Sequence, residues 1–156
     1  MNDLTARGDA APLFMMQPKE LSWWYWLASA ALLVLWVAGR AEAPWLLGGL
    51  SLVQIVHFGL KEKGLSAFPV QVRLAYAAVV AAAALDPTHL FVWIPTAGTI
   101  AQVVFGYCLL ARTLSLMPWN RTGPLTAARV WRTYTAPPRR GSVLQGQPPL
   151  RVAATR

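Results

Sequence analysis

The sequence predicts an all-α integral membrane protein, a four-helix bundle followed by a basic cytoplasmic C-terminal tail. Apolar residues make up 56% of the 156 residues and charged residues only 13%. Soluble domains average about 45–50% apolar and about 25% charged residues. Four apolar stretches approach the roughly 20 residues that a helix needs to cross a bilayer. Lys and Arg gather in alternate connecting segments, as expected of a chain that crosses a membrane repeatedly.

The first two apolar stretches each carry a signal for the start of a membrane helix. The stretch 21–39 begins with an aromatic run at 23–26, and such rings are typical of the headgroup region. The stretch 44–60 begins at Pro44. Proline suits the first helical position because the N–H there has no partner within the helix. We expect both stretches to cross the membrane.

The third and fourth stretches are predicted to form a tight antiparallel hairpin. The stretch 69–85 is rich in alanine, and the stretch 87–117 follows Asp86, a suitable helix cap. Small residues let membrane helices approach closely. The fourth stretch is about 45 Å long as a helix, against a hydrocarbon core of about 30 Å. Because Pro95 removes a backbone donor, we expect a helix kink there.

The distribution of Lys and Arg predicts the orientation. The N-tail 1–20 contains two, the loop 61–68 two, and the tail 119–156 seven, whereas the loop 86–89 contains none. Cytoplasmic loops carry an excess of basic residues. The sequence therefore predicts a multi-pass membrane protein with a four-helix domain at 21–118 and both termini in the cytoplasm.

The basic tail is predicted to begin with a short helix that lies on the membrane. Thr122 is the expected cap, and Val130 and Trp131 lie at helical spacing opposite Arg129 and Arg132. Disorder is expected from 137 to 156. The net charge is +8, so anionic phospholipid headgroups are the expected partner. Nucleic acid is not expected, because aromatic residues for base stacking are missing from the end of the tail.

A polar layer near the cytoplasmic ends of the helices is the candidate site. His57, Arg73 and Arg112 each lie about one turn into a predicted helix, with Gln71 and Tyr76 close by. Ionisable residues inside a membrane are costly and mark candidate sites. An arginine fork can bind a phosphate or carboxylate through two oxygens. Alternatively, the arginines extend to the headgroups and the histidine donates to a carbonyl. Both interpretations stay open.

The sequence predicts no metal site and no cofactor. Cys108 is the one cysteine, which excludes an intrachain disulfide and a cysteine-based zinc site. It lies in an apolar stretch with no base beside it, so we expect an unreactive thiol. His57 and His89 are predicted at opposite faces of the membrane, too far apart to share one haem. Haem ligation by one histidine or by a dimer stays open.

Two segments carry a resemblance. Ala67–Arg73 (AFPVQVR) and Phe105–Arg121 (FGYCLLARTLSLMPWNR) look like segments of small, uncharacterised four-span membrane proteins of bacteria. The similarity covers the chain from the second apolar stretch to Arg121. It implies a four-span inner-membrane protein and attaches no activity to it.

Three function hypotheses follow. The favoured one is a non-enzymatic accessory or assembly subunit that docks on a membrane protein partner, or on a second copy, through small-residue faces and the basic tail. The second is a lipid- or quinone-handling enzyme that uses His57, Arg73 and Arg112 as an anion-binding layer. The third is a small anion transporter, for which Thr99 and Gln102 are the polar candidates at mid-depth.

Overall fold

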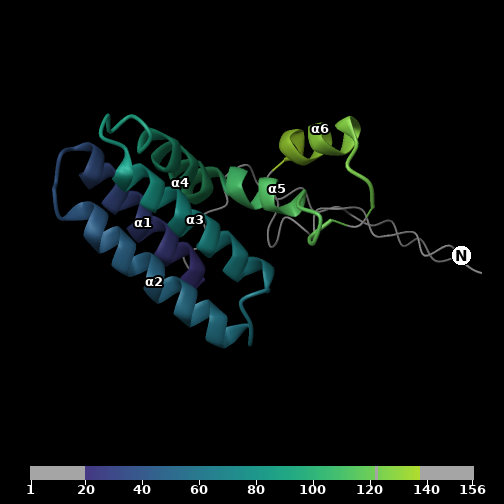
Figure 1. Cartoon of the computed structure of the whole chain (residues 1–156), viewed down its shortest axis with the longest axis horizontal. Helices are drawn as coiled ribbons and strands as arrows, with labels where there is room; N and C mark the ends of the chain where they lie inside the picture. The colour runs from purple at the N-terminus through teal and green to yellow at the C-terminus, as the bar shows by residue number, and fades with distance from the viewer. Residues whose placement is uncertain (1–19, 122, 138–156) are drawn as a thin grey trace, which may run out of the picture.

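The computed structural model describes residues 20–121 and 123–137, and these residues form six helices and no strand (Figure 1). The all-α prediction is therefore confirmed. The predictions for 1–19 and for 138–156 lie outside the described residues. The helices are α1 (Leu21–Val37), α2 (Ala43–Lys61), α3 (Phe68–Leu85), α4 (Trp93–Phe105), α5 (Leu109–Ser115) and α6 (Ala127–Thr135).

Two of these helices are long and apolar enough to cross a membrane. They are α2 and α3, with 19 and 18 residues. The pair α4 and α5 would add a third crossing if it formed one span, but the two helices meet at 94°. Helix α1 is also apolar and has 17 residues. Two or three crossings by length and composition are consistent with a membrane protein.

Helices α1 to α4 form the bundle, and their packing order differs from the prediction. Helix α1 packs against both α2 and α4, and α2 packs against α3, whereas α4 makes few contacts with α3. The expected tight hairpin between the third and fourth helices is therefore wrong. The connecting segment 86–92 is long enough to carry the chain past α3 to α1.

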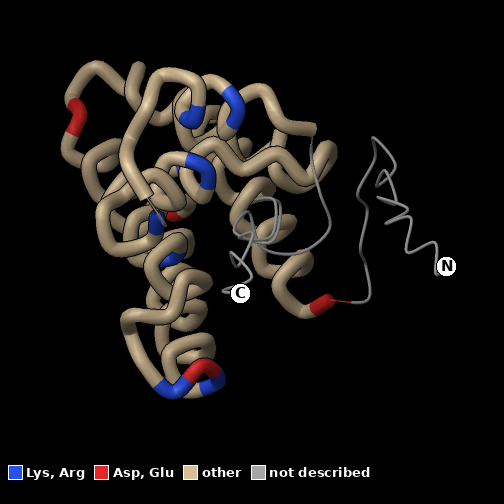
Figure 2. The backbone as a smooth tube through the Cα atoms, turned by 90° about the vertical axis from the view of Figure 1, so that its right-hand side faces the viewer, with Lys and Arg blue, Asp and Glu red and all other residues tan. Residues whose placement is uncertain are grey.

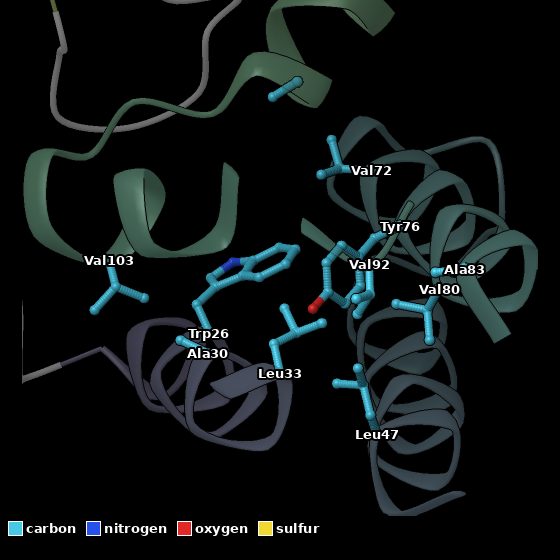
Figure 3. Close-up of a cluster of buried hydrophobic side chains, with 11 residues drawn as sticks. Trp26, Ala30, Leu33, Leu47, Val72, Tyr76, Val80, Ala83, Val92 and Val103 are labelled. Atoms are coloured by element: carbon cyan, nitrogen blue, oxygen red, sulfur yellow. The ribbon is translucent and has the colours of Figure 1, made fainter. Parts of the chain in front are cut away.

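The core lies where the four bundle helices meet. The rings of Trp26 on α1 and Tyr76 on α3 lie 5.0 Å apart, edge to face, in the middle of the buried side chains (Figure 3). Leu33 and Leu47 are fully buried beside them, and Val103 joins the cluster from α4. Edge-to-face pairs add to the stabilisation that ring burial supplies.

The break in the fourth apolar stretch lies after α4 rather than at Pro95. Pro95 is in the first turn of α4, where backbone N–H groups have no partner within the helix, so proline bends nothing there. Helix α4 ends instead at Gly106, which has a φ of 68°, a left-handed conformation that glycine adopts readily. The Cys108 sulfur then accepts a hydrogen bond from the Ala111 N–H at 3.3 Å, and Cys108 is therefore the N-cap of α5.

Two helices begin later than predicted. Asp86 follows α3 and does not begin a helix. Its carboxylate accepts hydrogen bonds from the Thr88 hydroxyl at 2.7 Å and the Phe91 N–H at 2.8 Å, which closes the turn before α4. Helix α6 begins later than predicted, because the Thr126 hydroxyl accepts from the Arg129 N–H at 3.2 Å.

Candidate functional site

One end of the bundle gathers basic and polar side chains, and we call it the basic end. It comprises the loop 62–67 with the adjoining ends of α2 and α3, the first turn of α1, and helices α5 and α6. Figure 2 shows the basic positions around loop 62–67 at the bottom of the view and further basic positions in its upper half. The Trp23 indole donates to the Val103 carbonyl at 3.3 Å, so the start of α1 meets the end of α4 here.

Arg73 is buried at the basic end and connects three helices. Its side chain is 4% exposed, and the guanidinium carbon lies 3.3 Å from the centroid of the Phe58 ring on α2. One terminal nitrogen donates to the Ser22 hydroxyl on α1 at 3.0 Å, and the other donates to the Pro69 carbonyl at 2.8 Å. Of the three guanidinium nitrogens of Arg73, only Nε has no hydrogen-bond partner among the described residues. The cation is stabilised by an aromatic face.

His57 lies in the same aromatic cluster. Its ring is 5.2 Å from the Phe58 ring and 5.8 Å from the Tyr25 ring, both edge to face. Phe58 therefore contacts His57 and the Arg73 guanidinium. The structure brings these two predicted site residues together around one phenyl ring, and His57 is half-buried.

Arg112 faces away from that cluster and towards α6. It is 5% exposed, and its guanidinium carbon lies 4.2 Å from the centroid of the Tyr107 ring. Its terminal nitrogens donate to the backbone carbonyls of Thr133 and Pro137. A cation at these carbonyls is favourable because the C-terminal end of a helix carries partial negative charge. The predicted layer is therefore divided, with Arg112 in a separate cluster.

Two further side chains attach α6, and sequence reasoning missed both. The Tyr107 hydroxyl donates to the Tyr134 carbonyl at 2.8 Å, and the hydroxyls of Thr113 and Tyr134 lie 3.1 Å apart. Three of the four partners in this cluster are backbone carbonyls, which are reached by Arg112 or Tyr107. Since any residue supplies a carbonyl, no residue pattern in the sequence could reveal these contacts.

Gln71 connects the start of α3 to the chain that follows α5. Its amide oxygen accepts from the Asn120 amide at 2.7 Å and from the Trp119 indole at 2.9 Å. Its amide nitrogen donates to the Ser66 carbonyl at 2.6 Å. The two segments that carry the family resemblance thus meet through Gln71 and Asn120.

Tyr76 lies deeper, in a row of buried polar side chains to which each bundle helix contributes. The Thr99 hydroxyl on α4 donates to the Tyr76 hydroxyl at 3.4 Å. The Gln54 amide on α2 donates to the Ser29 hydroxyl on α1 at 3.2 Å. All four side chains are at most 5% exposed. Hydrogen bonds of this kind hold membrane helices together.

No family model, no curated protein and no solved structure matches the chain. The geometry of the described residues is therefore the basis for inferring a function.

The geometry shows which chemistry the described residues can support. Within 20–121 and 123–137, no three His, Cys, Asp or Glu side chains lie together in a way that could hold a metal ion. A wide-open hollow lies at the opposite end from the basic residues and includes Asp86, Thr88 and Phe91 in its lining. The side chains of Arg73, Arg112, Gln71 and Tyr76, in contrast, make hydrogen bonds to other parts of the chain. His57 contacts the rings of Tyr25 and Phe58.

Proposed function

We propose that the protein is a non-enzymatic accessory or assembly subunit of a larger complex in a bacterial inner membrane. The observation that supports this most is a contrast within the bundle. The buried polar side chains described above bind other parts of the chain, whereas α2 carries an apolar face that nothing in the described chain covers. An enzyme or transporter needs polar groups open to a ligand, and the residues Arg73 and Arg112 are only 4% and 5% exposed.

The uncovered face of α2 has the features of a helix-docking surface. Its large side chains are strongly exposed and lie at helical spacing, and they include Trp45 at 82%, Leu52 at 64% and Val56 at 60%. A Cβ placed on Gly48 or Gly49 would meet no heavy atom within 4 Å. The glycine pair therefore serves no packing inside the described chain. In a membrane, small residues on an apolar face favour close contact with another helix.

We place α1 to α4 as the four crossings, with the basic end in the cytoplasm. Helix α4 has 13 residues, about 20 Å, and it is preceded by the apolar residues 90–92. A short crossing is accommodated when the bilayer thins locally. Lys61, Lys63 and the arginines of the tail then face the cytoplasm, whereas the ion pair of Arg40 with Glu42 faces the other side.

Photo-crosslinking from α2 in native membranes tests the docking proposal. We expect a photoreactive residue at Leu52 to form a discrete adduct with a second membrane protein. The same residue at Ala81, an exposed position on α3, is the matched control and should label lipid. Gly49→Leu should remove the Leu52 adduct, because the added side chain keeps a partner helix at a distance. Adducts at Leu52 with lipid alone, or with a second copy of this chain, would contradict the proposal.

Topology reporters test the orientation separately. A reporter that is active only in the cytoplasm should give a signal when it is fused after Arg156. A reporter that is active only in the periplasm should give a signal when it is inserted after Gly39. The opposite result at either position would place the basic end outside the cytoplasm and would remove the positive-inside argument.

A further inference from the structure

Helix α6 is attached to the protein by polar contacts at its C-terminal end. No residue of α6 is buried. Arg112 binds the carbonyls of Thr133 and Pro137, and the Tyr107 hydroxyl binds the carbonyl of Tyr134. These bonds use the backbone of α6 and leave most of its side chains free for another surface. We call Tyr107, Arg112 and Thr113 the α6 anchor.

The side chains that α6 and the preceding segment leave exposed combine apolar rings with positive charge. Trp131 is 73% exposed, Trp119 69% and Leu125 54%. Arg132 is also exposed, and Arg129 is partly exposed. The whole sequence contains no Asp or Glu after Asp86. Tryptophan and arginine together suit the boundary between lipid chains and anionic headgroups.

The bend after α4 brings this segment to the level of the headgroups. Helices α4 and α5 meet at 94°, so if α4 crosses the membrane, α5 runs along its surface. Gly106 makes the turn with its positive φ. The α6 anchor then holds α6 beside α5 (Figure 1).

We propose that α6 docks on the anionic phospholipid leaflet at the basic end, with Trp131 in the headgroup region and Arg129 and Arg132 against lipid phosphates. Two observations favour a lipid leaflet over an acidic protein. The 94° bend directs α5 along the membrane surface once α4 crosses the membrane, which is the part of the proposed function on which this inference rests. Large apolar side chains also accompany the arginines. The proposal is independent of the α2 partner, because it needs the bundle and lipid only.

Hydrogen exchange of the full-length protein in nanodiscs tests this proposal. We compare nanodiscs of phosphatidylcholine alone with nanodiscs that also contain phosphatidylglycerol, and we follow the backbone amides of 127–135. Exchange should be slower with phosphatidylglycerol. Two arginines at an anionic surface strengthen binding by about 30-fold. The double variant Arg129→Gln/Arg132→Gln should lose this difference. Arg40→Gln, at the opposite end, is the matched control and should keep it.

Variants of the α6 anchor separate positioning from lipid binding. Tyr107→Phe removes one bond to α6 without changing charge, so exchange should rise in both kinds of nanodisc while the preference for phosphatidylglycerol persists. Equal exchange in the two kinds of nanodisc would overturn the proposal, as would a preference that survives the double variant. Protection seen in native membranes and absent from both kinds of nanodisc would identify a protein partner and would also overturn it.

Discussion

The guanidinium carbon of Arg73 lies 3.3 Å from the centroid of the Phe58 ring, and this stack joins α3 to α2 inside the bundle. Ser22 extends the contact to α1 by accepting a hydrogen bond from the same guanidinium. One side chain thus connects three helices at the basic end. The stack also explains how a cation can be buried there, because the ring face and two oxygen acceptors replace water.

Replacing Arg73 by lysine should destabilise the bundle. An ammonium cannot stack flat on Phe58 and reach both oxygen acceptors, so we expect a loss of about 1–2 kcal/mol in the free energy of unfolding. Reversible unfolding in mixed detergent micelles measures this value. Arg40→Lys is the control, because the ion pair of Arg40 with Glu42 is largely exposed and such pairs contribute about 0–1 kcal/mol. Equal effects of the two variants would contradict the stacking role.

Removal of the hydroxyl in Tyr76→Phe tests the buried polar row. The bond from Thr99 to Tyr76 is long, at 3.4 Å, so its contribution should be small. A double-mutant cycle with Thr99→Val should give a coupling energy of about 0.6 kcal/mol, the usual value for a hydrogen bond between two membrane helices. Additive effects of the two substitutions would show that the hydroxyls do not interact.

Two glycines of the fourth apolar stretch should respond oppositely to alanine. Gly106→Ala places a Cβ at a φ of 68°, which costs about 1–2 kcal/mol and weakens the bend before α5. Gly98 lies inside α4, and a Cβ there would meet no heavy atom within 4 Å. Gly98→Ala should therefore stabilise the helix by about 0.5–1 kcal/mol. Unfolding measurements on both variants check the opposite signs, and a stabilised Gly106→Ala would refute the positive-φ argument.

The turn at Asp86 should lose stability in acid. Hydrogen bonds from the Thr88 hydroxyl and the Phe91 and Thr88 N–H groups lower the pKa of Asp86 to about 2 from its ordinary 3.8. Because the folded pKa lies below the unfolded one, the stabilisation is complete above the unfolded pKa and disappears as the pH falls through about 2. NMR titration of the Asp86 carboxyl measures the shift.

A matched variant isolates the cause of that shift. Thr88→Val removes the hydroxyl and keeps the size of the side chain, so the pKa of Asp86 should rise towards its ordinary value. Thr113→Val, at the basic end, should leave it unchanged. An unaltered pKa in Thr88→Val would assign the shift to the backbone donors alone.

Local signals in the sequence predicted much of the secondary structure. Pro44 and Pro69 stand at helix starts, as expected from the lack of an N–H partner at that position. The expected starts near 86 and 122 misled, because Asp86 follows α3 and closes a turn, and the cap of α6 is Thr126. The path of the backbone decides which of several nearby capping residues begins a helix. Pro95 misled for a related reason: its effect depends on where the helix begins, and α4 begins just two residues before it.

The candidate site was predicted only in part. His57 and Arg73 do lie in one cluster, because each stands about a turn from its end of the α2–α3 connection and both meet Phe58. Arg112 lies beyond the bend at Gly106, and depth counted along a straight helix could not detect that. Its acceptors are backbone carbonyls, which have no signature in a sequence.

Composition and residue order by themselves determined the helical class, the apolar character of the segments and the concentration of charge at one end, since these depend on each residue's own preference for lipid or water. Tertiary structure alone decided that α4 packs on α1, that the chain turns at Gly106, and that Arg112 holds α6. Those outcomes depend on which distant surfaces fit together, and fit is a property of helices in contact rather than of any one segment.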